Sequence, residues 1–185
     1  MLLEKVDESK ILLEDNERVL TISCGALHTL VKTGKMAYLF STQFPIDKNR
    51  LFSCGFGETY ALGNGDTKNC PDFEQVNFIK TNTSRPNYQK AEEVEKIACG
   101  LTHSGCIRSG KIYIWGLYSH KDSSVLKIPT VLEFNASASG RKSENDYFID
   151  LALGDALSVF LNSKGECYTL GENIDGQLGI PNVSS

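Results

Sequence analysis

The sequence lacks the features that mark membrane-spanning or charge-driven nucleic-acid-binding proteins. No apolar run approaches the ~18 residues that a membrane helix needs, and charged residues interrupt the apolar start of the chain at once. Lys and Arg number 19 against 23 Asp and Glu, so the net charge is −4. No excess positive charge exists to drive binding to DNA or anionic lipid. We therefore expect a soluble intracellular protein.

Cysteine and proline are also sparse. Six Cys and five Pro in 185 residues are too few for a disulfide-stapled miniprotein or a Pro-rich linker. No two Cys form C-x-x-C, and no His stands at zinc-finger spacing from a Cys pair, which disfavours a zinc site. We expect reduced cysteines, mostly in the core. The length fits one domain with a sizeable core.

Helical periodicity is missing too, and a repeat takes its place. Three segments align, at 19–35, 94–116 and 148–171. Each has an alternating apolar strand that ends in a glycine, then a second strand and a turn glycine. The last two share a third strand that ends in Gly116 or Gly171. In the first segment, Leu51–Gly55 fits that strand after an insert at about 35–50.

The strands of this repeat are apolar on both faces. In Lys111–Trp115, isoleucines alternate with aromatic residues, which predicts a sheet buried on both sides. Short strands bounded by glycine and polar turns, repeated every ~50 residues, are typical of propeller blades or of a stacked β-solenoid. The predicted class is all-β, with very little helix.

Specific motifs in these segments resemble a known family. Ile22-Ser-Cys-Gly25-x-x-His28, Ile97-Ala-Cys-Gly100-x-x-His103, Trp115-Gly116 and Gly176-Gln-Leu-Gly179 are similar to the regulator of chromosome condensation repeat. The resemblance covers about 10–181 and implies a seven-bladed β-propeller fold, of which this chain supplies about three blades. The repeats lie at approximately 10–66 with the insert 35–50, 71–126 and 128–181. The residues that serve this repeat structurally are Gly25, His28, Gly100, His103, Trp115, Gly116, Gly154, Gly171, Gly176 and Gly179.

One loop resembles a functional element of the family. Trp115-Gly-Leu-Tyr118 followed by Ser-His-Lys-Asp-Ser-Ser is similar to the wedge hairpin of members that exchange nucleotide on the small GTPase Ran. The resemblance implies a Ran-type GTPase as partner, a nuclear location, no cofactor and no bond-breaking chemistry. The GTPase-binding residues that it implies are Tyr118, Ser119, His120, Lys121, Asp122 and Asp155.

The chain also departs from the family pattern. Leu101 and Thr102 stand where the wedge-bearing repeat commonly has an acidic residue, and Ile180 replaces an arginine. In the next repeat the family has an aspartate immediately before the histidine position, and this chain has Ala156 there. The nearby acidic residue, Asp155, lies one position earlier. These changes favour an alternative in which the propeller is an interaction scaffold without exchange activity. Chromatin binding is weakly supported, because the chain is acidic and has no basic N-terminal tail.

The repeated histidines and glycines have structural explanations. His28 and His103 occupy the same place in two repeats, so we expect each to be hydrogen-bonded within its own blade, whereas His120 lies in the wedge loop. Gly55–Gly65 lacks the P-loop order, and it aligns with Gly171–Gly179 as a turn at the end of a blade.

Three blades of seven cannot close a ring. We expect three four-stranded units, with strands at Ile11–Leu13, Glu74–Phe78 and Thr130–Phe134 preceding the three repeat glycines. Each terminal unit should expose an apolar blade face. The chain is therefore expected to self-associate or to form part of a longer protein.

Overall fold

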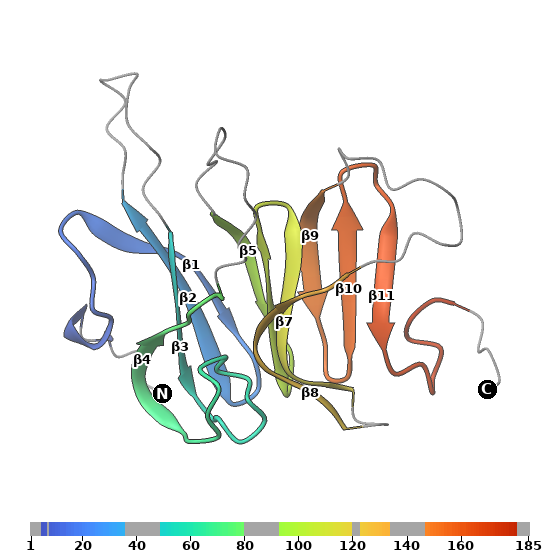
Figure 1. Cartoon of the computed structure of the whole chain (residues 1–185), viewed down its shortest axis with the longest axis horizontal. Helices are drawn as coiled ribbons and strands as arrows, with labels where there is room; N and C mark the ends of the chain where they lie inside the picture. The colour runs from blue at the N-terminus through green and yellow to red at the C-terminus, as the bar shows by residue number, and fades with distance from the viewer. Residues whose placement is uncertain are drawn as a thin grey trace.

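The computed structural model describes residues 5–6, 8–35, 49–79, 93–119, 123–133 and 147–180. In this part of the chain, strands form three antiparallel sheets that stand side by side in a row (Figure 1), and the helical content is one short 3-10 turn at Glu8–Lys10. The described chain is therefore an all-β segment of about three propeller blades, as the sequence predicts. None of its helices is long and apolar enough to cross a membrane.

Each sheet is formed by consecutive strands. The first has the order β1-β2-β3-β4, with β1 (Glu17–Cys24), β2 (His28–Lys35), β3 (Arg50–Gly55) and β4 (Cys70–Gln75). The second has the order β5-β6-β7-β8, with β5 (Val94–Cys99), β6 (His103–Arg108), β7 (Lys111–Ser119) and β8 (Ser124–Val131). The third has β9 (Phe148–Leu153), β10 (Leu157–Asn162) and β11 (Cys167–Gly171), with β10 in the middle.

The strand pairings test the expected arrangement of each unit. β3 pairs with β2 from Arg50 to Gly55, which confirms the third strand displaced by the insert. The third sheet has three strands within the described residues rather than the expected four. The strand expected at 74–78 is instead β4, which ends at Gln75 and pairs with β3. β8 ends at Val131, and residue 134 lies outside the described residues.

The two apolar faces of β7 pack into two different cores. Tyr113 and Trp115 belong to the cluster between the first and second sheets, whereas Ile112 and Ile114 belong to the cluster between the second and third. Because neighbouring side chains on a strand point to opposite faces, a central sheet needs apolar residues at every position. The buried members of the two clusters are Leu30, Leu51, Val76, Val94, Cys99, Cys106, Tyr113 and Trp115, and Ile107, Ile112, Ile114, Leu151 and Phe160.

The N-terminal segment covers the outer face of the first sheet. The prediction of a strand at Ile11–Leu13 is wrong, because these residues lie in turn and irregular structure. Ile11 is 7% exposed and packs on Val31 and Phe52, and the Arg50 guanidinium donates a 2.7 Å hydrogen bond to the Leu12 carbonyl. The bare apolar face expected at this end is therefore partly covered by residues 8–13, although Ile22 on β1 stays 64% exposed.

Candidate protein-interaction face

The first hairpin turn of every sheet lies at the same end of the molecule. In each turn the repeat glycine donates its backbone N–H to the carbonyl three residues later, at 2.9 Å in 25–28, 2.8 Å in 100–103 and 2.9 Å in 154–157. The second and third turns also contact each other, because Leu101 N–H donates to the Gly154 carbonyl at 3.1 Å. We call this end, formed by residues 25–28, 100–103 and 154–157, the turn face.

The repeat glycines allow these turns to approach each other closely. A Cβ on Gly25 would lie 2.3 Å from the Gly100 oxygen, and a Cβ on Gly100 would lie 2.4 Å from the Gly154 oxygen. Contacts this short with backbone atoms leave no room for a methyl group. The glycines of the first two repeats are therefore needed where one blade meets the next, whereas a Cβ on Gly154 would meet only the Leu157 side chain of its own turn, at 3.2 Å.

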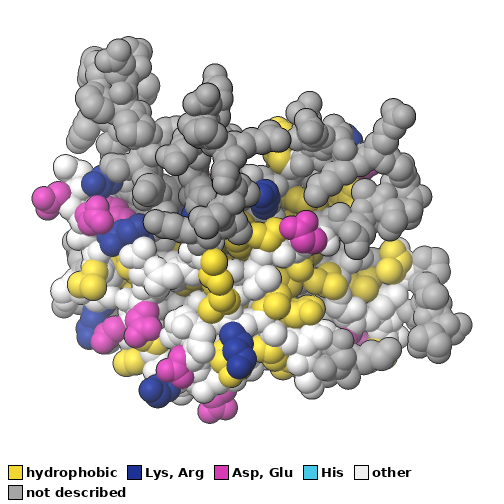
Figure 2. Space-filling model, viewed as in Figure 1, with side chains coloured by type: hydrophobic (Ala, Val, Ile, Leu, Met, Phe, Trp, Pro, Cys, Tyr) yellow, Lys and Arg dark blue, Asp and Glu magenta, His cyan; other side chains and the backbone are white. Residues whose placement is uncertain are grey.

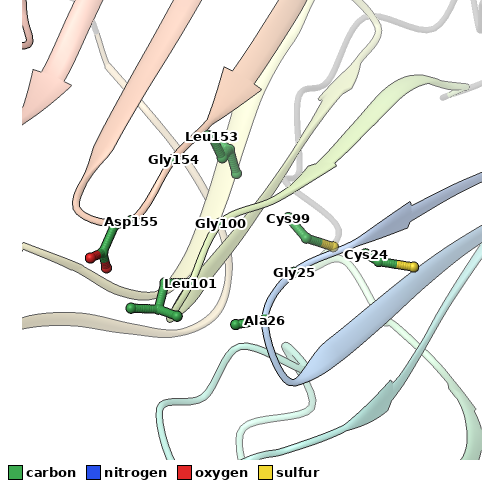
Figure 3. A pocket seen from close by; sticks show the side chains of 9 residues that line it. All are labelled: Cys24, Gly25, Ala26, Cys99, Gly100, Leu101, Leu153, Gly154 and Asp155. Carbon is green, nitrogen blue, oxygen red and sulfur yellow. The ribbon is translucent and has the colours of Figure 1, made fainter.

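A shallow depression at the turn face receives three equivalent residues from each sheet (Figure 3). The exposed Asp155 carboxylate is its one charged side chain, and Leu101 is 39% exposed in the neighbouring turn. No group of His, Cys, Asp and Glu among the described residues could hold a metal ion. The lining residues are Cys24, Gly25, Ala26, Cys99, Gly100, Leu101, Leu153, Gly154 and Asp155.

The repeated histidines join neighbouring blades, which corrects the expectation of a bond within one blade. His28 Nε2 lies 2.8 Å from Ser104 Oγ in the second sheet. Because that hydroxyl donates to the Ala61 carbonyl at 2.8 Å, the histidine ring donates to the hydroxyl. His103 Nε2 likewise lies 2.9 Å from Ser158 Oγ in the third sheet.

Burial fixes the charge state of the first histidine. His28 is 4% exposed, and burial lowers its pKa to about 4, so the ring is neutral at pH 7. The sequence holds one signal of these partners, because a hydroxyl residue follows the histidine position in every repeat: Thr29, Ser104 and Ser158. In the third sheet the position of the histidine is taken by Leu157.

The turn after β3 receives the single tryptophan of the chain. Trp115 is fully buried, and its Nε1 donates to the Ala61 carbonyl at 2.8 Å. The alignment of this turn with Gly171–Gly179 is confirmed, because the bond from Gly63 N–H to the Tyr60 carbonyl at 3.0 Å recurs from Gly179 to Gly176 at 3.0 Å. Gly55–Gly65 is thus a blade-end turn in the structure.

The base of the wedge-like loop lies at the turn face. Gly116 of β7 pairs with His103, so the chain that follows runs toward the 100–103 turn. Leu117 N–H donates to the Thr102 carbonyl at 2.9 Å, and Thr102 Oγ1 donates to the Leu117 carbonyl at 2.8 Å. Tyr118 is half-buried and packs against the core between the second and third sheets. Ser119 ends β7, whereas His120, Lys121 and Asp122 lie outside the described residues.

The surface charge shows no single-sign patch on the side that Figure 2 presents. Basic and acidic side chains lie interspersed over the first sheet and the lower edge, and a band of hydrophobic side chains crosses the second and third sheets. This distribution does not provide a basic track for phosphates.

Comparisons with known proteins agree with the fold. Residues 48–107 match the regulator of chromosome condensation (RCC1) repeat. The chain is 27% identical over 89% of its length to the RCC1 domain-containing protein RUG3, mitochondrial, of Arabidopsis thaliana, covering 32% of it. It is 27% identical over 89% of its length to the X-linked retinitis pigmentosa GTPase regulator of Canis lupus familiaris, covering 14% of that protein.

Solved structures give the same result for the fold. Prp20p from Saccharomyces cerevisiae, whose structure was described with its binding properties to Gsp1p and histones, matches with a TM-score of 0.60 at 18% identity. The match covers 88% of this chain and 34% of that one. The chain thus spans about a third or less of the relatives described here.

Proposed function

Because this chain belongs to the RCC1 repeat family of β-propellers, we propose that its turn face docks a Ran-type small GTPase and promotes nucleotide release. The observation that carries the proposal is the common position of two elements. The base of the wedge-like loop at Tyr118 and the exposed Asp155 carboxylate both lie at this end of the sheets. The similarity to Prp20p, which is described as binding Gsp1p, supports the choice of partner.

The proposed action is displacement rather than bond chemistry. A GTPase that holds its nucleotide at nanomolar to picomolar strength has about −12 to −16 kcal/mol of binding free energy to be opposed. A factor that weakens nucleotide binding must itself bind the nucleotide-loaded GTPase less tightly. The tightly packed glycine turns provide a preorganised surface, and the packing of Tyr118 holds the loop base while residues 119–124 press on the GTPase.

The charge of Asp155 supplies the proposed contact with a basic residue of the GTPase. A carboxylate at the rim of an interface steers association and pairs with Lys or Arg of the partner. A nuclear location is part of this proposal and rests on the same family resemblance.

The second candidate function is an interaction scaffold without exchange activity. Leu101 and Ala156 favour it, because they put apolar side chains where exchange-active members commonly carry acids. The two functions differ in one observable property. A scaffold binds its partner without changing the rate at which a GTPase loses nucleotide.

The test measures release of fluorescent GDP from Ran with and without the full chain. We expect stimulation that falls when Tyr118→Ala is introduced or when 119–124 is deleted. Asp155→Ala should lower the release rate by about three- to tenfold, whereas the matched control Asp15→Ala, an exposed carboxylate on the N-terminal turn, should leave it unchanged.

Two outcomes would count against the exchange proposal. Equal stimulation by the loop-deleted chain would show that the wedge assignment is wrong. No stimulation at all, together with direct Ran binding, would leave the scaffold function.

A further inference from the structure

The turn between β3 and β4 places an exposed asparagine directly before a glycine (Figure 1). Asn64 and Gly65 are both exposed, and they form the one Asn-Gly pair in the sequence. Gly65 has a φ of 81° and no side chain to shield its backbone nitrogen. Asparagine amides are chemically labile, and the nitrogen of the following residue is the nearest group that can attack one.

Two hydrogen bonds of opposite kind hold the Asn64 amide. Its Oδ1 accepts from the Asp66 N–H at 3.0 Å, and its Nδ2 donates to Glu74 Oε2 at 3.2 Å. A backbone N–H only donates and a carboxylate only accepts, so these partners fix which end of the amide is the oxygen. The bond from Asp66 also folds the side chain back over its own backbone, because it comes from two residues further along the chain.

This arrangement favours attack on the amide carbon by the Gly65 nitrogen. Negative charge develops on Oδ1 during the attack, and the Asp66 N–H is already in place to stabilise it. No described residue accepts a hydrogen bond from the Gly65 N–H. The nitrogen can therefore lose its proton without first breaking a contact within the described part of the chain.

Asn162 provides a comparison within the same chain. Its Oδ1 also accepts a backbone N–H from two residues further along, that of Lys164, at 3.0 Å. The following nitrogen belongs to Ser163, and it donates to the Tyr147 carbonyl at 2.8 Å. Asn162 is only 3% exposed, whereas Asn64 is exposed. The two asparagines thus share the contact at the oxygen and differ in burial and in the state of the attacking nitrogen.

We propose that Asn64 is a modification site, at which the folded chain converts its own asparagine into aspartate and isoaspartate. The Gly65 nitrogen loses its proton and forms a bond to Asn64 Cγ. The Cγ–Nδ2 bond then breaks, and the amide group takes up a proton and leaves as ammonia, which gives a five-membered succinimide ring. Water opens the ring at Cγ to give aspartate, or at the main-chain carbonyl to give isoaspartate. No electrons are transferred, so water is the only co-reactant.

The products change a turn that contacts the second sheet. An aspartate at position 64 cannot donate to Glu74, and it brings a second negative charge to that carboxylate. Isoaspartate adds one carbon to the main chain beside Gly63, whose Cβ position is 2.7 Å from Trp115 Nε1. The Ala61 carbonyl of the same turn accepts the hydrogen bond from that indole at 2.8 Å. Modification at Asn64 should therefore loosen the contact between the first and second sheets at Trp115.

The first experiment compares two Asn-Gly pairs in one molecule. The full-length Ser163→Gly variant carries such a pair at 64 and at 162, and it keeps the backbone N–H at position 163. It is incubated at mildly alkaline pH, folded in buffer or unfolded in urea, and peptide mass spectrometry measures the conversion at each position. We expect similar rates in urea. In buffer, Asn64 should react at least about tenfold faster, because the N–H at 163 must first leave the Tyr147 carbonyl.

The second experiment tests the consequence for the fold. Trp115 is the one tryptophan, so its fluorescence reports on this contact alone. As the incubated wild type is converted, its emission should move to longer wavelength and its midpoint of urea unfolding should fall. Asn64→Gln is the matched control, because it keeps an exposed amide but would need a six-membered ring to react. It should show no conversion at this position and no change in either property.

Any of three results would overturn the proposal. The first is an absence of conversion at Asn64 in the folded chain while it proceeds in urea. The second is an equal rate at Asn64 and Asn162 in the folded Ser163→Gly variant, because the fold would then select neither position. The third is unchanged Trp115 emission and unchanged stability in fully converted protein. None of these measurements involves a GTPase, so the outcome is independent of the exchange proposal.

Discussion

At the residue scale, the buried His28 links stability to pH. Its pKa is lowered to about 4 by burial, whereas an unfolded chain has the ordinary value of 6.5. Between these values the unfolded state binds more protons, so the unfolding free energy rises with pH. This stabilisation is fully present above about pH 6.5 and is lost as the pH falls to about 4. The unfolding free energy changes by about 3 kcal/mol across this range.

The measurement is urea unfolding at a series of pH values from 4.5 to 7.5 for the wild type and His28→Leu. The variant has no ring to protonate, so we expect a lower unfolding free energy at pH 7.5 but a flatter profile across this window. A variant profile as steep as that of the wild type would show that another group titrates there.

Glu17 is a second titrating residue, and it affects stability in a separate pH range. Burial alone would raise the pKa of Glu17, but hydrogen bonds from Arg50, from the Glu14 N–H and from Thr33 lower it to about 2. This carboxylate therefore contributes stability above about pH 4.5 that is lost as pH falls toward 2. The histidine range lies above it, so the two contributions are separable.

The same ion pair holds the N-terminal segment in place. Glu17 is 2% exposed at its side chain, and Arg50 contacts both this carboxylate and the Leu12 carbonyl. We expect Arg50→Met to lower the unfolding free energy by about 3–5 kcal/mol, because it leaves a buried carboxylate without its cation. The double variant Arg50→Met with Glu17→Leu should recover much of this loss in urea unfolding. Equal stability of the single and double variants would contradict this account.

At the scale of elements, the hairpin turns depend on how closely two backbones approach. Gly100→Ala puts a methyl group 2.4 Å from the Gly154 oxygen, and we expect it to cost about 3 kcal/mol in the free energy of unfolding. Gly165→Ala is the matched control. Gly165 has a φ of 83°, and no described atom lies within 4 Å of its Cβ position. The substitution should therefore cost only about 1 kcal/mol, through backbone strain. Urea unfolding of both variants checks the difference, and equal losses would argue against close approach as the cause.

The strands could be predicted where alternating apolar residues and terminal glycines marked them. The contacts between blades were harder to predict. The two-sided apolar pattern of 111–115 correctly predicted burial on both faces of β7. Ile11–Leu13 has the composition of a strand, yet a tertiary contact with Phe52 holds it as a turn. The partners of His28 and His103 lie 76 and 55 residues away, and local sequence does not specify which blade supplies them.

At the scale of the whole molecule, the three sheets form a linear series. Each of the two main cores joins one pair of consecutive sheets. Because residues 8–13 cover part of the first sheet, we now expect self-association of the isolated chain to occur mainly through the third. Light scattering at tens of micromolar should show a weak dimer for the wild type and for Ile22→Asp, and a monomer for Leu161→Asp. A wild-type monomer would contradict this expectation.

His103 and Ser104 are neighbours in the sequence, and this has a consequence for how a repeat protein of this kind can gain further blades. His103 reaches forward to the next blade, and Ser104, its neighbour in sequence, receives the bond from the blade before. A gene duplication that copied the second blade would carry both halves of the junction, so the new copy could be inserted directly after the original. After the third blade the same copy would place Ser104 against Leu157, which cannot donate the hydrogen bond that His28 provides at the first junction.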